Sequence, residues 1–256
     1  MKKSKIAVLV AMVVVLAFSL AACGGSDKSS SDKTVYKVGT EPTFPPFDTT
    51  DEDQNIVGLD MDLIKAIGED QGFDVEFENL SFDGLIPALK AGNIDIVAAG
   101  MNKDDEDRQK EVDFSDSYYE SKLFVAVTED NTTIKSVEDL TPDMKVAAQT
   151  GTTGASKVKE LKDAGKIKEA VILDGLDTCM MKLINGDVSA VINDKPVTEA
   201  YIKKQPDKIK MVGEALNAEN YGFAVQKGNA ELVEKINNGL KHIKENGTYD
   251  KLVDEW

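Results

Sequence analysis

Short β-branched and apolar runs alternate with stretches of helical periodicity from Tyr36 to the end of the chain. Runs of this length predict strands, and apolar positions recurring every three to four residues predict helices. The predicted strands are 35–39, 74–78, 94–99, 122–128, 144–149, 170–173, 188–193, 208–212 and 221–226. The predicted helices are 59–70, 82–91, 104–112, 154–164, 176–185, 195–204, 229–245 and 248–255. Alternation of the two element types indicates the α/β class.

One helix–glycine–strand unit occurs twice, around Gly92 in Ala88–Val97 and around Gly186 in Lys182–Val191. Glycine suits the position after a helix, where φ is positive. The repeat favours two similar α/β lobes over one large sheet, although any α/β protein contains such turns. Two lobes would enclose a cleft at the carboxyl ends of their strands, where open α/β sheets bind ligands.

The N-terminus has the pattern of an export signal. Residues 1–5 are basic, residues 6–18 form an apolar run too short to span a bilayer, and Leu-Ala-Ala precedes Cys23. The four residues Leu20-Ala-Ala-Cys23 resemble the bacterial lipobox, which implies cleavage before Cys23 and lipid on its sulfur. We therefore expect a signal peptide at 1–22 and a flexible, lipidated tether at 23–33. The alternative is an ordinary signal peptide with an incidental cysteine.

Composition excludes several classes of function. The formal net charge is −16, and removal of residues 1–22 makes it −19, which argues against nucleic acid as a partner. Beyond Cys23 the chain has one cysteine, Cys179, which we expect to be buried, and one histidine, His242, which we expect to face solvent. No internal disulfide, zinc cluster or histidine-based catalytic site is therefore expected, and no cofactor or metal is predicted.

Arg108 is the only arginine among 30 basic residues. Its planar guanidinium can grip a carboxylate through two parallel hydrogen bonds, which lysine cannot do. The alternative is that Arg108 balances the acidic run at 104–107.

Two strand ends carry polar residues. The segment Gln149-Thr-Gly-Thr-Thr-Gly154 follows a predicted strand and opens a helix, so its N–H groups suit an anion. The alternative is that Thr152 or Thr153 serves only as the N-cap of this helix. Asn193-Asp194 ends another strand, where the acid can pair with an ammonium group or cap the next helix.

A proline-stiffened loop after the first predicted strand carries Glu41, Phe44 and Phe47, and Phe82 begins a helix after another strand. Exposed aromatic rings there could flank the apolar part of a ligand, and the alternative is core packing.

The motifs Thr40-Glu-Pro-Thr-Phe-Pro-Pro-Phe47, Val57-Gly-Leu-Asp-Met-Asp-Leu63, Ser81–Leu89, Arg108…Val112-Asp-Phe-Ser-Asp116, Gly151-Thr-Thr-Gly154 and Glu245–Asp250 occur in this order. Together they resemble the polar amino-acid-binding proteins of ABC importers, solute-binding family 3, from Val35 to Trp256. The resemblance implies a periplasmic-binding-protein fold with a two-segment hinge, with lobe 1 at 34–119 and 221–256 and lobe 2 at 123–217.

The resemblance also implies roles for site residues. Arg108 would bind the ligand α-carboxylate with N–H groups of Asn102, Thr152 and Thr153, and Asp194 would bind the α-ammonium with a carbonyl near Ala99 and Gly100. Phe44 and Phe82 would flank the side chain, and Glu41, Gln149 and Asn193 would meet its tip. The stretch 100–108 is one residue longer than usual, and Asn102 stands where Thr or Ser is common, which weakens its assignment.

The expected function is capture of a free polar amino acid by closure of the lobes. Glu41 would repel aspartate and glutamate, which leaves glutamine or arginine and lysine as favoured ligands. The expected partners are the permease and ATPase of an importer, with the protein a lipid-anchored, extracytoplasmic monomer. The alternatives are a dehydratase-like enzyme that uses Glu41 as acid or base, and a sensor ectodomain.

Overall fold

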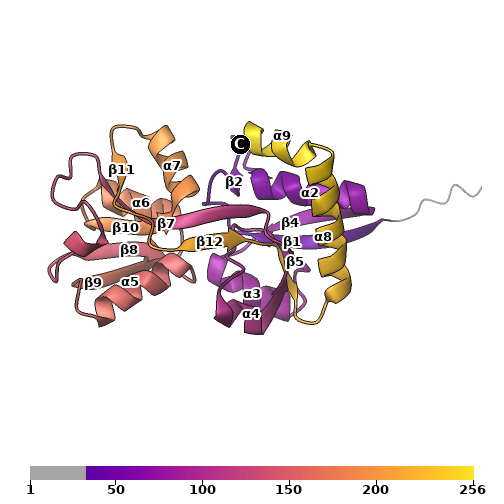
Figure 1. The fold of residues 1–256 in the computed structure, drawn as a ribbon, viewed down its shortest axis with the longest axis horizontal. Helices are drawn as coiled ribbons and strands as arrows, with labels where there is room; N and C mark the ends of the chain where they lie inside the picture. Colours follow the sequence, from indigo (N-terminus) through magenta and orange to yellow (C-terminus); the bar gives the residue numbers. More distant parts are fainter. Residues whose placement is uncertain (1–32) are drawn as a thin grey trace, which may run out of the picture. The chain divides into compact units, whose positions relative to one another are not determined.

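Two large β-sheets with packed helices form the part of the chain that the structure describes, residues 33–256 of the computed structural model (Figure 1). The predicted signal peptide and Cys23 lie outside the described residues. The two sheets agree with the two α/β lobes that the repeated helix–glycine–strand unit predicts. No helix among residues 33–256 is long and apolar enough to cross a membrane.

The first sheet has the strand order β4-β1-β5-β13-β6. β1 pairs in parallel with β4 and β5, whereas β13 runs antiparallel to β5 and β6. The strands of this sheet are β1 (Thr34–Thr40), β4 (Phe73–Asn79), β5 (Ile96–Val97), β6 (Val112–Phe114) and β13 (Ala224–Gln226). Its side of the molecule also contains β2 (Thr49–Thr50), β3 (Ile56–Val57), α2 (Leu59–Gln71), α3 (Phe82–Lys90), α4 (Glu106–Glu111), α8 (Ala230–Glu245) and α9 (Thr248–Glu255).

The second sheet has the order β11-β7-β10-β8-β9, with β12 paired to β7. β10, β8 and β9 are parallel, and β7 runs antiparallel to β10, β11 and β12. The strands are β7 (Tyr119–Thr128), β8 (Lys145–Gln149), β9 (Glu169–Leu173), β10 (Ala190–Asp194), β11 (Ile209–Val212) and β12 (Ala218–Tyr221). The accompanying helices are the 3₁₀ turn η1 (Val137–Asp139), α5 (Thr153–Asp163), α6 (Leu176–Ile184) and α7 (Lys195–Lys204).

Two neighbouring segments connect the sheets. β7 and β12 pair from Lys122↔Ala218 to Tyr119↔Tyr221, and Figure 1 shows them side by side between the two sheets. The contact continues towards the first sheet, where the Tyr118 N–H donates to the Tyr221 carbonyl at 3.0 Å. This pair has the form of the two-segment hinge expected from the sequence, and the exact lobe boundaries stay a prediction.

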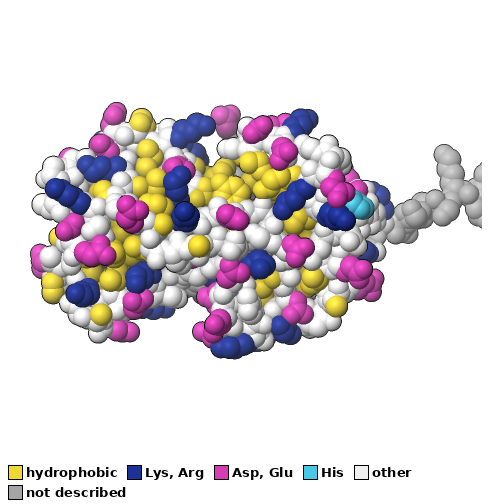
Figure 2. Space-filling model, viewed as in Figure 1, with side chains coloured by type: hydrophobic (Ala, Val, Ile, Leu, Met, Phe, Trp, Pro, Cys, Tyr) yellow, Lys and Arg dark blue, Asp and Glu magenta, His cyan; other side chains and the backbone are white. Residues whose placement is uncertain are grey.

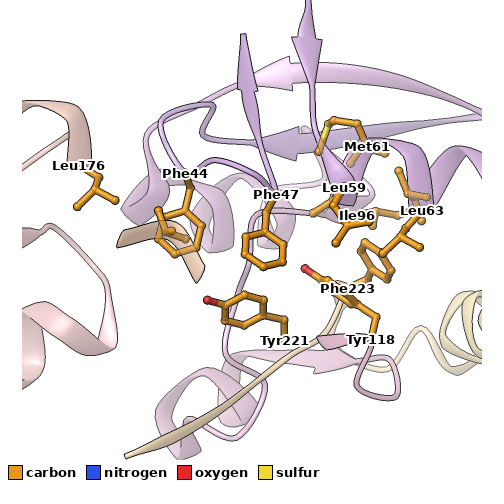
Figure 3. Packing of buried hydrophobic residues seen from close by; sticks show 14 of the residues in the cluster. Phe44, Phe47, Leu59, Met61, Leu63, Ile96, Tyr118, Leu176, Tyr221 and Phe223 are labelled. Carbon is orange, nitrogen blue, oxygen red and sulfur yellow. The ribbon is translucent and has the colours of Figure 1, made fainter. Parts of the chain in front are cut away.

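Aromatic side chains fill the core beside these connections (Figure 3). The rings of Tyr118 and Phe223 stack at 4.4 Å, and the ring of Phe47 meets that of Tyr221 edge-on at 5.0 Å. All four side chains are almost fully buried. Burial of each large side chain contributes about 2–3 kcal/mol, so the first-sheet end of the connections is firmly packed.

The strand predicted at 221–226 is wrong as a single element, because the structure has β12 and β13 there with a break at Gly222 and Phe223. The N–H of Gly222 donates to the Met101 carbonyl, and that of Phe223 donates to Ser115 Oγ, so neither joins a sheet ladder. The strand predicted at 94–99 is shorter in the structure, where β5 is Ile96–Val97. The short strands β2, β3 and β6 carry too few residues to show a period and were not predicted.

Cys179 and His242 lie where the sequence predicts, the first buried and the second exposed to solvent. Cys179 is fully buried, and burial raises the pKa of its thiol to about 12. His242 is exposed, and its Nδ1 lies 2.8 Å from Asp70 Oδ2. Within residues 33–256 no group of His, Cys, Asp and Glu side chains is arranged to hold a metal ion.

Candidate functional site

Arg108 lies in α4 and is 8% exposed. The Asp105 carboxylate caps this helix by accepting the N–H groups of Asp107 and Arg108, which fixes the direction of the Arg108 side chain. The guanidinium lies 5.3 Å from the centre of the Phe82 ring. Its Nη1 donates to the Asn102 carbonyl at 3.3 Å, and its Nη2 donates to the Gly151 carbonyl at 2.9 Å. Because Gly151 belongs to the side of the second sheet, Arg108 bridges the two sides.

The N-terminus of α5 lies next to this guanidinium. Thr152 Oγ1 accepts the Ala155 N–H at 3.0 Å and donates to the Gln149 carbonyl at 2.7 Å, so Thr152 is the N-cap, one of the two residues expected. Gly151 has φ +78°, and an added Cβ would lie 2.9 Å from Asp83 Cβ, which shows how closely the two sides approach. A helix N-terminus beside a buried arginine gives a positive potential that suits an anion.

Asp194 ends β10 and is 6% exposed. Its side chain does not cap α7. Instead Oδ1 accepts the Tyr221 hydroxyl at 2.6 Å and the Ser121 hydroxyl at 3.1 Å. Burial, and then the nearby Glu219 carboxylate, raise the pKa of Asp194 to about 7, against the lowering effect of both hydroxyls and of Arg108. The capping alternative is wrong, because the Asp194 carboxylate accepts no N–H group of α7. The two hydroxyls come from the two connecting strands, β12 and β7, and orient the carboxylate through Oδ1.

Glu219, in β12, belongs to the same cluster and was missed from the sequence. Its side chain is 2% exposed, and Oε1 accepts the Asn217 amide at 2.9 Å. Burial raises its pKa, while Thr153 and Arg108 lower it. The only sequence signal for Glu219 was its place just before a predicted strand. Its partners come from distant segments of the chain, so this signal does not show that Glu219 is buried in the site.

Glu41 and Gln149 meet across the two sides. Gln149 Nε2 donates to Glu41 Oε2 at 2.8 Å and lies 3.0 Å from the Asp174 carbonyl. The Thr43 hydroxyl donates to the same Glu41 oxygen at 2.8 Å. Burial raises the pKa of Glu41, and these two hydrogen bonds oppose the increase. The structure thus brings together Glu41 and Gln149, two of the three residues expected at one end of the site.

The aromatic and backbone residues expected around the site lie in the first-sheet side. The Phe44 ring is 7% exposed and lies 6.4 Å from that of Tyr221 (Figure 3). Gly100 has φ +52°, and an added Cβ would lie 2.7 Å from this ring, so glycine permits the contact. The Gly100 N–H donates to Asp60 Oδ2 at 2.8 Å, and Ala99 precedes it, also buried.

The side chain of Asn193, expected at the ligand tip, is engaged elsewhere, and so is the side chain of Asn102, of which only the N–H group was expected in the site. The Asn193 amide donates to Thr198 Oγ1 at 3.2 Å in α7. The Asn102 side-chain oxygen accepts the N–H groups of Asp104 and Asn220 at 3.1 and 3.2 Å. Asn102 therefore takes part through its backbone carbonyl, which accepts from Arg108, and its side chain fixes a turn.

Charged side chains elsewhere do not form a competing site on the visible face of the molecule. Figure 2 shows acidic and basic side chains interspersed there despite the net charge of −16. The described ion pairs are exposed surface contacts such as Lys37–Glu78. Such pairs contribute little to stability. The candidate site therefore comprises the buried charges of Arg108, Asp194 and Glu219, together with the Glu41–Gln149 pair, which also joins the two sides.

Two α/β lobes joined by paired connecting strands, with buried charges meeting between them, define the periplasmic-binding-protein fold. A solved structure described as "An ancestral arginine-binding protein bound to arginine" has this fold with a TM-score of 0.83 and 44% identity, covering 88% of this chain and 98% of that one. The ancestral amino acid-binding protein AncCDT-1, a precursor of cyclohexadienyl dehydratase, matches with a TM-score of 0.80 and 38% identity, covering 87% of this chain and 95% of that one.

Residues 36–256 match the family of bacterial extracellular solute-binding proteins, family 3, and the chain belongs to that family. Among curated relatives, a "Probable histidine-binding protein" of Neisseria gonorrhoeae is 34% identical over 245 residues, covering 92% of this chain and 90% of the relative. The family resemblance expected from the sequence motifs is thereby confirmed.

Proposed function

We propose that this protein binds a free amino acid with a cationic side chain between its lobes, with arginine or lysine favoured over glutamine. The observation that carries the proposal is the excess of buried acidic groups. The carboxyl groups of the half-buried Asp105 and of the buried Glu219 and Asp194 act on the one guanidinium of Arg108, and Glu41 adds a further buried carboxyl group beside Gln149. A ligand with two positive groups and one carboxylate would match this excess of buried acidic groups over basic ones. The arginine-bound ancestral structure and the relative named for histidine support the same class of ligand.

In this proposal the ends of the ligand are divided between the lobes. The remaining N–H groups of Arg108 and the N-terminus of α5 bind the α-carboxylate. Asp194 binds the α-ammonium, since both of its hydrogen bonds from the connecting strands use Oδ1 and leave Oδ2 for a ligand. The ring of Phe82, stacked on Arg108, and that of Phe44 flank the ligand stem. A zwitterion that bridges the lobes stabilises their closed arrangement.

A thermal-shift screen of the ligand-free protein with each of the twenty amino acids tests the proposal. A ligand that binds only the folded state raises the melting temperature in proportion to the logarithm of its concentration over Kd. Arginine and lysine should give the largest shifts, and aspartate and glutamate none. A shift with glutamine alone would select the alternative ligand, and no shift with any amino acid would refute the proposal.

Glu41→Gln is expected to change specificity rather than abolish binding. Loss of the carboxylate removes an ion pair with the ligand side chain but leaves a hydrogen-bonding group, so affinity for arginine should fall about 10- to 100-fold while affinity for glutamine stays within a few-fold. Isothermal titration calorimetry measures both. Glu52→Gln is the matched control, because Glu52 is an exposed loop residue. An equal loss for both ligands would contradict the assigned role.

We also propose delivery of the ligand to an ABC importer by a protein anchored through lipid on Cys23, and the family match supports the importer as the partner class. Labelled palmitate should be incorporated into the wild-type protein in bacteria, and Cys23→Ala should be unlabelled and released from the membrane. Labelling that persists in Cys23→Ala would refute the anchor.

An enzyme on the same fold is the second candidate, because one of the matched structures is a dehydratase precursor. Glu41 would then act as acid or base, but it is already hydrogen-bonded to Gln149 and Thr43. Mass spectrometry of amino acids incubated with the protein separates the two functions, since a binding protein returns its ligand unchanged.

A further inference from the structure

Thr43, in the loop that follows β1, is held by two elements of the other lobe. The Tyr201 hydroxyl of α7 donates to the Thr43 carbonyl at 3.1 Å. The N–H of Leu176, the first residue of α6, donates to Thr43 Oγ1 at 3.2 Å. Neither bond involves Arg108 or Asp194, and both join the lobe of the first sheet to that of the second.

We propose that the Tyr201–Thr43 contact is a latch between the lobes that sets affinity for the ligand without choosing which ligand binds. This inference rests on the proposed function, because a latch matters to binding only if the ligand is captured by closure. Tyr201 is then a positioning residue, since it acts on the closed state and not on the ligand.

The effect follows from what opening does to these bonds. When the lobes separate, the hydroxyl and the carbonyl exchange their mutual bond for bonds to water, so only the closed state keeps it. A ligand that binds the closed state has an apparent affinity proportional to the population of that state. Loss of one partly buried neutral hydrogen bond should weaken affinity about three- to tenfold, by the same factor for every ligand.

Tyr201 is the better residue to change, because the Thr43 hydroxyl also donates to Glu41 in the candidate site. Tyr201→Phe removes only the hydroxyl and keeps the ring, which packs against the buried core. Burial raises the pKa of Tyr201, so its hydroxyl keeps its proton at physiological pH.

Tyr249→Phe is the matched control. The Tyr249 hydroxyl also donates to a backbone carbonyl, that of Tyr118, but both residues lie on the side of the first sheet. Opening of the lobes leaves this bond intact. The two variants therefore lose the same chemical group, and only the Tyr201 bond joins one lobe to the other.

Calorimetric titrations with L-arginine and L-lysine test the latch. Tyr201→Phe should weaken both by the same three- to tenfold factor, mainly through faster dissociation, and Tyr249→Phe should leave both within twofold of wild type. Unchanged affinity in Tyr201→Phe would overturn the proposal. A change in the ratio of the two affinities would also overturn it, because it would place Tyr201 against the ligand.

A second measurement keeps failure of the latch distinct from failure of the proposed function. Spin labels on Glu69→Cys in α2 and Lys159→Cys in α5, both exposed positions, report the distance between the lobes in ligand-free protein. If L-arginine does not bind the wild type, the proposed function fails, but Tyr201→Phe should still shift the distance distribution to longer values than Tyr249→Phe does. Identical distributions would overturn the latch.

Discussion

Replacement of Arg108 by alanine should reduce affinity for the amino acid by about a thousandfold or more, the largest loss expected for any single change in this protein. Truncation of one partner of a buried, hydrogen-bonded charge pair costs about 2–5 kcal/mol or more. The variant also lacks the hydrogen bond that Arg108 donates to the Gly151 carbonyl, one of the contacts that join the two lobes. Isothermal titration calorimetry with L-arginine should show no measurable heat of binding at micromolar protein concentrations.

Two variants control this result. Lys110→Ala removes a positive charge from the same helix, but its partner Asp107 is exposed, so affinity should not change. Arg108→Lys keeps the charge and loses the two parallel hydrogen bonds, so it should bind more weakly than wild type. Near-wild-type affinity in Arg108→Ala, with the protein folded, would refute the carboxylate-binding role.

The second large effect is expected at Asp194, and it depends on pH. Asp194→Asn should weaken binding at pH 8 by about a hundredfold, because the ligand ammonium loses its buried counter-ion. Burial, and then the neighbouring Glu219 carboxylate, raise the pKa of Asp194 to about 7, so this carboxyl group takes up a proton as the pH falls towards 5.5. An ammonium group binds the ionised form, so binding near and below this pH releases a proton.

The sign of the pH dependence follows from this release. Affinity of the wild type should rise with pH through about 7, and should fall by up to about tenfold per pH unit below it. The raised pKa also means that Asp194 stabilises the ligand-free fold at low pH, an effect lost as the pH rises from about 4 through about 7. The pKa values of Glu219 and Glu41 are raised as well, so these two groups also make the ligand-free fold less stable as the pH rises.

Calorimetry between pH 5.5 and pH 8, in buffers of different ionisation enthalpy, measures both the affinity and the protons released. Asp194→Asn should show a shallower pH dependence and less proton release than wild type. Ser136→Ala serves as a control, because Ser136 lies in an exposed capping turn. Equal proton release in Asp194→Asn and wild type would contradict the assignment of the ammonium site.

The sequence predicted most elements, because periodicity reports which face of a segment is buried. α7 and α9 have the bounds expected, and α2 and α3 differ by one residue at an end. The strands that were missed or merged have bounds that depend on hydrogen bonds to segments far away in the sequence. The strand predicted at 221–226 divides because Gly222 and Phe223 bond to Met101 and Ser115, which local sequence does not reveal.

In the candidate site, too, some residues could be predicted from local sequence, and others depend on contacts between distant segments. Arg108 was a candidate because it is a lone arginine among lysines, and Asp194 because it ends a strand, and the family resemblance supplied the role proposed for each. Glu219 and Tyr221, which surround Asp194, come from a strand whose partner β7 lies about a hundred residues earlier in the sequence. The side-chain directions of Asn102 and Asn193 likewise depend on segments that only the fold brings near.

The position of β13 in the first sheet has a consequence for biosynthesis. Strands β5 and β6 lie within residues 96–114, but the strand that joins them, β13, begins at Ala224. This sheet therefore cannot close before the segment at 224–226 is available to pair, whereas β8, β9 and β10 lie closer together along the chain. Premature termination before Ala224 should leave two unpaired strand edges, and such edges invite aggregation.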